Sequence, residues 1–142
     1  MIEEDAFLEW AHVHKHRYGT PLSEMERLGK LNRYPLLDID VQGGMQIKEK
    51  VPDALLIFVL PPSMEILEKR LRKRATDSNQ SIEGRLQAAR NEMEYLRKYD
   101  FFVVNNQLEN AVLQMKKIID AAKTQVSYNQ NYIQKILGGM YG

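Results

Sequence analysis

Residues 36–44 carry the densest group of side chains that could do chemistry. Leu36–Val41 is an apolar run interrupted by Asp38 and Asp40, and two glycines follow it. Alternate residues of a strand lie on one face, so a strand here would place both carboxylates together near its end. Ligands of open α/β sheets bind beyond the carboxyl ends of the strands. We interpret this stretch as a site for a metal ion, a base edge or a ring of arginines. The alternative is that an aspartate here only caps the next helix.

A second group is basic. Arg70 and Arg74 are four residues apart and would share one face of a helix, and Arg85 lies in the first turn of the next helix. The polar segment 75–80 separates them, as expected of a loop that closes over phosphate. The alternative is an ordinary solvated face. Two more basic residues of the first helix are expected to point elsewhere, Arg72 and Lys73.

Three histidines alternate along the chain at His12, His14 and His16. On one strand they would share a face, and this spacing occurs in zinc sites. Glu9 is the nearest carboxylate that could complete such a site. We favour a solvated strand face and predict no metal site.

The hydrophobic pattern predicts an α/β architecture around a parallel sheet. A strand is expected at 6–13, and then a helix capped by Thr20 with Pro21 as its first residue. The other expected elements are strands at 36–41, 54–60 and 101–104, and helices at 42–50, after Ser63, from 82 to 96, at 108–122 and in the tail up to Gly138–Gly139.

The composition narrows the function classes. The 142 residues include no cysteine, which excludes disulfides and thiolate metal sites. A net charge of +1, from 20 basic and 19 acidic residues, argues against a nucleic-acid partner. The longest apolar stretch, Ala54–Leu60, is too short to span a membrane. We expect a cytoplasmic protein of one structural domain.

Six stretches of the sequence resemble guanylate kinase, in the order found in that family. They are Phe7–Ala11 (FLEWA), Tyr18–Pro21 (YGTP), Leu37–Gly43 (LDIDVQG), Phe58–Ser63 (FVLPPS), Arg74–Ser78 (RATDS) and Tyr99–Asn105 (YDFFVVN). The resemblance implies a P-loop nucleoside-monophosphate-kinase fold with a parallel sheet, part of the GMP-binding region and a lid. It implies transfer of a phosphoryl group from ATP to GMP. Mg²⁺ would arrive with ATP rather than at a dedicated protein site.

The resemblance also assigns roles to individual residues. Glu9, Thr20 and Asp40 are implied as guanine contacts, Tyr18 as a ligand of the GMP phosphate, and Asn105 as a contact to the ATP base. Two further GMP-site residues are expected beside Asp40, namely Asp38 and Gly43. The arginines expected to act on the transferring phosphoryl group are Arg70, Arg74 and Arg85.

One part of the family pattern does not occur in these residues. Guanylate kinases begin with a strand and a loop G-x-x-x-x-G-K-[ST], and the 142 residues contain no such sequence. The chain thus resembles the C-terminal two-thirds of the enzyme, and we expect it to be inactive alone. A mis-called start, a trimmed chain and a genuinely shorter protein all stay open as explanations. Three smaller departures from the family pattern are Lys15–Arg17, Ala75 and Asn106–Gln107.

We expect four regions within the one domain: 1–35 from the GMP-binding region, 36–73 as core, 74–82 as lid loop and 83–142 as core with C-terminal helices. Exposed sheet edges would favour homo-oligomers. A non-catalytic guanylate-kinase-like interaction module is the alternative function, and a metal-dependent hydrolase built on the histidines is a third.

Overall fold

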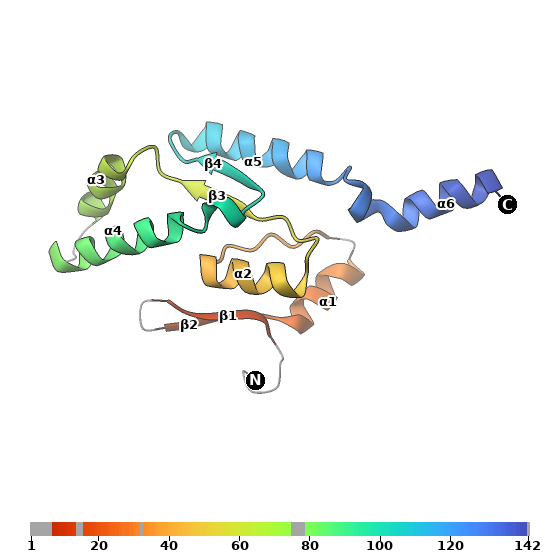
Figure 1. Ribbon diagram of the computed structural model, residues 1–142, viewed down its shortest axis with the longest axis horizontal. Helices are drawn as coiled ribbons and strands as arrows, with labels where there is room; N and C mark the ends of the chain where they lie inside the picture. Colours follow the sequence, from red (N-terminus) through yellow and green to blue (C-terminus); the bar gives the residue numbers. More distant parts are fainter. Residues whose placement is uncertain (1–6, 14–15, 32, 75–78, 142) are drawn as a thin grey trace. The chain divides into compact units, whose positions relative to one another are not determined.

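The computed structural model describes residues 7–13, 16–31, 33–74 and 79–141. The chain divides into two compact units, Met1–Ala54 and Leu55–Gly142. Each unit has its own strands and helices (Figure 1). The finer division expected from the sequence, with boundaries after residues 35, 73 and 82, stays a prediction.

The first unit begins with a pair of antiparallel strands. β1 (Phe7–Val13) pairs with β2 (His16–Pro21), with Glu9 opposite Thr20 and Ala11 opposite Tyr18. The expected strand at 6–13 is confirmed by β1. α1 (Leu22–Lys30) follows directly, and Pro21 is its N-cap residue. The expected cap at Thr20 is wrong, because β2 stays in the ladder as far as Pro21, which pairs with Phe7.

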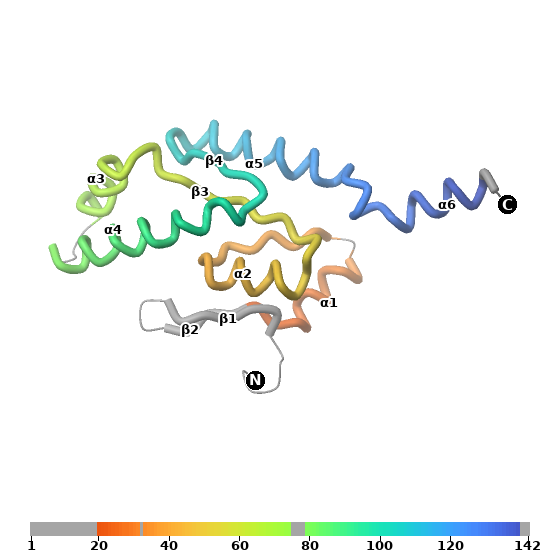
Figure 2. Tube along the Cα trace, in the orientation of Figure 1, coloured from red at the N-terminus to blue at the C-terminus, as the bar shows by residue number. Residues whose placement is uncertain are grey.

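The stretch 36–41 is not a strand. Residues 33–40 have no regular secondary structure, and α2 (Val41–Lys50) begins directly after them (Figure 2). A strand needs a neighbour for its backbone hydrogen bonds. Within the described ranges, the only sheets are the β1–β2 pair and the β3–β4 pair, and neither includes this segment. α2 itself agrees with the expected helix at 42–50.

α2 packs against β1 within this unit. Its buried residues are Gly43, Gly44 and Ile47, which recur at helical spacing on one face. The two glycines have no side chain, so this face of α2 allows a close backbone approach. Lys48 ties the end of the helix to the following chain, because its Nζ donates a 2.9 Å hydrogen bond to the carbonyl of Ala54.

The second unit is built on a pair of parallel strands. β3 (Ile57–Leu60) pairs with β4 (Phe101–Val104). The Leu56 N–H donates a 2.8 Å hydrogen bond to Oδ2 of Asp100, and the Asn105 N–H donates to the carbonyl of Leu60 at 2.7 Å. These bonds extend the pairing beyond both ends of the ladder. The expected α/β class with a parallel sheet is confirmed.

Helices connect and follow the two strands. They are α3 (Met64–Arg74), α4 (Asn79–Met93), the short 3₁₀ helix η2 (Leu96–Lys98), α5 (Leu108–Ala122), the short 3₁₀ helix η3 (Val126–Asn129) and α6 (Gln130–Tyr141). The expected cap at Ser63 is confirmed, because its Oγ accepts a 3.1 Å hydrogen bond from the Ile66 N–H. α6 continues through Gly138 and Gly139, where the sequence predicted its end.

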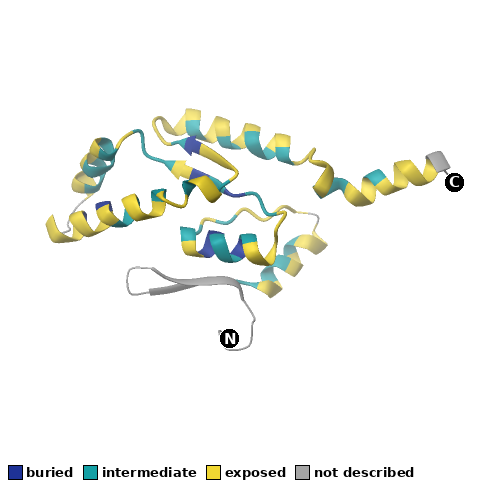
Figure 3. Ribbon diagram, viewed as in Figure 1, coloured by how far each residue is buried: buried dark blue, intermediate teal, exposed yellow. Residues whose placement is uncertain are grey.

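The buried residues of this unit lie on the strands, directly before β3 and on α4 (Figure 3). They are Leu56, Phe58, Ile82, Leu86 and Val103. Both faces of the strand pair also expose an apolar side chain: Val59 is 51% exposed and Phe102 is 60% exposed. Parallel strands normally have both faces covered. The covering of this pair is therefore incomplete.

Candidate functional site

The residues expected to bind guanine begin on the β1–β2 pair. Glu9 lies directly opposite Thr20, and Tyr18 lies two residues along β2. Residues that face each other across a ladder, and alternate residues along it, belong to one face. The register thus places Glu9, Tyr18 and Thr20 on one face, with Cα atoms of the opposed pair about 5 Å apart.

The histidines are not grouped in the same way. His12 pairs with Arg17, whereas His16 pairs with the adjacent Val13. His12 and His16 are therefore on different strands and opposite faces, so the expectation that they share a face is wrong. His14 lies outside the described residues. The described ranges contain no cluster of three or more His, Asp or Glu side chains that could hold a metal ion.

Asp40 has a structural role at the start of α2. Its Oδ1 accepts a 3.0 Å hydrogen bond from the N–H of Gly43, and its own backbone is extended, as in an N-cap residue. Gly43 is buried, and Asp38 is exposed on the irregular segment before the helix. Asp40 therefore caps α2, which was the alternative interpretation of this residue from the sequence. The cap uses Oδ1 of Asp40 and does not use Oδ2.

The basic residues of the second unit differ in what they contact. Arg70 on α3 donates from Nη1 to the carbonyl of Asn105 at 2.7 Å and from Nη2 to the carbonyl of Asn106 at 3.2 Å. The structure thus brings together Arg70 and Asn105, for which the resemblance implied separate roles. Arg74 is exposed at the last position of α3, and Arg85 is exposed on α4. Of the segment expected as a loop, Asn79 and Gln80 belong to α4 and 75–78 lie outside the described residues.

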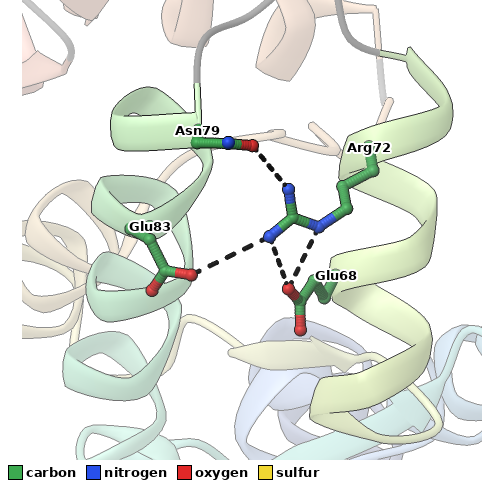
Figure 4. A network of polar contacts seen from close by, with 4 residues as sticks. All are labelled: Glu68, Arg72, Asn79 and Glu83. Carbon is green, nitrogen blue, oxygen red and sulfur yellow. Dashed lines mark hydrogen bonds and ion pairs between the residues drawn. The ribbon is translucent and has the colours of Figure 1, made fainter.

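Arg72 is a residue whose importance the sequence reading missed. Its Nε and Nη2 both donate to Oε1 of Glu68 on α3, at 3.1 and 2.7 Å. Its Nη1 donates to Oδ1 of Asn79 on α4 at 2.9 Å, and its Nη2 lies 3.9 Å from Oε1 of Glu83 (Figure 4). From the sequence we expected only that Arg72 points away from the other arginines, and we did not anticipate these contacts. The spacing of Glu68 and Arg72 was a usable signal, but the partners on α4 were not readable from the sequence.

The comparisons with known proteins decide the family. The guanylate kinase family model matches residues 1–122. The chain belongs to the guanylate kinase family. It is 43% identical over 136 residues to the guanylate kinase of Caldanaerobacter subterraneus subsp. tengcongensis, covering 96% of this chain and 66% of the relative. It is 47% identical over 123 residues to the Myxococcus xanthus guanylate kinase, covering 86% of this chain and 59% of the relative.

A solved structure supports the same family. The crystal structure of guanylate kinase from Anaplasma phagocytophilum matches with a TM-score of 0.72 and 27% identity, covering 87% of this chain and 60% of that chain. The 142 residues therefore span about three-fifths to two-thirds of the length of these guanylate kinases. No helix within the described ranges is long and apolar enough to cross a membrane.

Proposed function

We propose that these residues form the GMP-binding and phosphoryl-contacting parts of a guanylate kinase, which transfers the γ-phosphoryl group of Mg-ATP to GMP. The observation that carries the proposal is the pairing of Glu9 with Thr20 in a chain of this family. Guanine presents adjacent N–H donors on its pairing edge, and one carboxylate can accept from both. A threonine hydroxyl beside it can donate to the guanine carbonyl, which adenine lacks.

The other assigned residues fill out the GMP site in this proposal. Tyr18, on the same face of the strand pair, would contact the GMP phosphate. Asp40 would offer guanine the carboxylate oxygen that the α2 cap does not use, and Asp38 and Gly43 would flank it. An aspartate that both caps a helix and binds a base is held in one orientation before the ligand arrives.

Phosphoryl transfer needs positioning and positive charge around the transferring group. Arg74 and Arg85 are exposed cations on α3 and α4 that can supply such charge. Arg70 keeps N–H donors beyond those used on the Asn105 and Asn106 carbonyls, and its place beside Asn105 suits contact with ATP. Mg²⁺ would be held by the phosphates of ATP in this proposal.

These 142 residues include no Gly-rich phosphate loop, so we propose that they do not transfer phosphate by themselves. A coupled assay with Mg-ATP and GMP tests this on two proteins. One is the 142-residue chain, and the other is a chimera in which the N-terminal third of the Caldanaerobacter subterraneus guanylate kinase precedes Met1. We expect turnover on the order of 1–100 per second from the chimera and no turnover from the 142-residue chain.

Two results would contradict it. Comparable turnover by the 142-residue chain would show that the loop is not needed. A folded chimera that neither binds GMP nor turns over would favour the alternative of a non-catalytic interaction module.

A further inference from the structure

The contact between α3 and α4 includes a network of polar side chains. α3 has no buried residue, whereas α4 buries Ile82 and Leu86. Between the two helices, Arg72 binds Glu68 on its own helix and Asn79 and Glu83 on the other (Figure 4). We call these four residues the α3–α4 clasp.

Single exposed ion pairs contribute little to stability, but a network around one arginine is an exception. The guanidinium of Arg72 is planar and presents its donors in a fixed fork, so binding Glu68 fixes the direction of the N–H groups that reach α4. The side chains of Arg72 and Glu68 are 43% and 39% exposed, so the clasp is only partly shielded from solvent. The clasp should therefore affect the position of α4 relative to α3 more than the free energy of unfolding.

The clasp lies away from the arginines proposed to contact phosphate. Residues two apart on a helix point about 200° apart. Arg72 is two residues from both Arg70 and Arg74 on α3, and Glu83 is two residues from Arg85 on α4. On α3, Arg70 and Arg74 thus point away from the clasp, and on α4 Arg85 points away from it.

We infer that Arg72 is a positioning residue, which fixes α4 against α3 and so fixes the position of Arg85 relative to Arg70 and Arg74 without itself contacting nucleotide. This inference rests on the proposed function for its effect on phosphoryl transfer. Its effect on α4 is independent of that function. Misplacing a catalytic group by about 1 Å can cost on the order of a hundredfold in rate. A clasp between the last turn of α3 and the first turns of α4 can therefore affect turnover.

The first test is hydrogen exchange of the backbone amides of α4 in the 142-residue chain. Arg72→Met should speed exchange in the first two turns of α4 about threefold to tenfold, because opening of this end of the helix becomes easier. The double variant Asn79→Ala/Glu83→Gln should reproduce that change, and adding Arg72→Met to it should have little further effect. Glu68→Gln removes only the partner on α3 and should change α4 less. Lys73→Met, a neighbouring exposed cation, is the matched control.

The second test is steady-state kinetics in the chimera. Arg72→Met and Asn79→Ala/Glu83→Gln should each lower kcat about tenfold with KM for GMP nearly unchanged, and Arg72→Lys should recover part of the loss. Lys73→Met should change neither constant. The double variant Asn79→Ala/Glu83→Gln keeps Arg72 itself, so it tests the clasp even if Arg72→Met folds poorly.

The results separate the two proposals. An inactive wild-type chimera would refute the proposed function, and the exchange rates would then decide the clasp alone. An active chimera that both clasp variants leave unchanged would overturn the positioning role, as would α4 exchange rates equal to those of wild type.

Discussion

Arg70 on α3 donates a 2.7 Å hydrogen bond to the backbone carbonyl of Asn105, directly after β4. A second bond from the same guanidinium reaches the carbonyl of Asn106 at 3.2 Å. Carbonyls at the end of a strand have no further partner in the ladder, and a charged donor binds them more strongly than a neutral one. Arg70 therefore attaches α3 to the carboxyl end of the parallel strands.

Arg70→Met should destabilise the chain by roughly 1–2 kcal/mol, because two charge-assisted hydrogen bonds at a partly exposed site are lost. Urea unfolding followed by circular dichroism measures this difference. Lys69→Met, at an exposed position of the same helix, is the control and should change the free energy of unfolding little. Equal effects of the two substitutions would mean that the Asn105 contact does not stabilise the fold.

Asp40 permits a separation of its capping role from its proposed role in GMP binding. Asp40→Ala should cost about 1 kcal/mol of stability through loss of the bond to Gly43, whereas Asp40→Asn should cost little because asparagine caps equally well. Asp40→Asn should nevertheless weaken GMP binding in the chimera, because the carboxylate is lost. Asp38→Ala is the control for stability. Unchanged GMP affinity in Asp40→Asn would leave Asp40 with the cap alone.

The local features of the fold could be predicted from the sequence. Ser63 lies three residues before an N–H that it caps, and the helical stripe of α4 includes Ile82 and Leu86, both of which are buried. These signals act over a few residues and need no distant partner. Residues 36–41 have the composition of a strand, but a strand forms only beside another strand. Whether a partner strand lies beside them depends on the tertiary fold, which the local sequence does not specify.

The same distinction holds in the site. The resemblance to guanylate kinase implied guanine contacts at Glu9 and Thr20, and the register of the strand pair places these two residues opposite each other. The sequence pattern missed Arg72, because Asn79 and Glu83 lie on a different helix and nothing in a single sequence says how two helices dock. It also grouped the histidines wrongly, because the end of β1 at Val13 and the start of β2 at His16 put His12 and His16 on different strands.

The exposed apolar residues of the strand pair predict self-association of the 142-residue chain. Val59 and Phe102 lie on opposite faces of the β3–β4 pair, so both faces can associate with another molecule. Sedimentation velocity over a range of concentrations should show species larger than the monomer. Phe102→Lys and Val59→Lys should shift the distribution toward monomer, and Lys73→Met should not. A monomer at all concentrations would refute this prediction of self-association.

Arg74 and Arg85 are proposed to act on the transferring phosphoryl group, where negative charge develops. In the chimera, Arg74→Met or Arg85→Met should lower kcat on the order of a hundredfold with much smaller changes in KM. Lys73→Met removes a nearby positive charge that is not proposed to contact the phosphoryl group. The Lys73→Met chimera should retain nearly full activity. Small and equal effects at all three positions would mean that the basic run is only a solvated face.

Glu9 is proposed to accept hydrogen bonds from guanine, and calorimetric titration of GMP into the chimera measures this contact. Glu9→Gln should weaken GMP binding by roughly 2–4 kcal/mol, because an amide N–H would face the guanine N–H groups and charge-assisted bonds would be lost. Glu26→Gln, at an exposed position of α1, should bind GMP as wild type does. A Glu9→Gln chimera that is folded and binds GMP with unchanged affinity would show that Glu9 does not contact guanine.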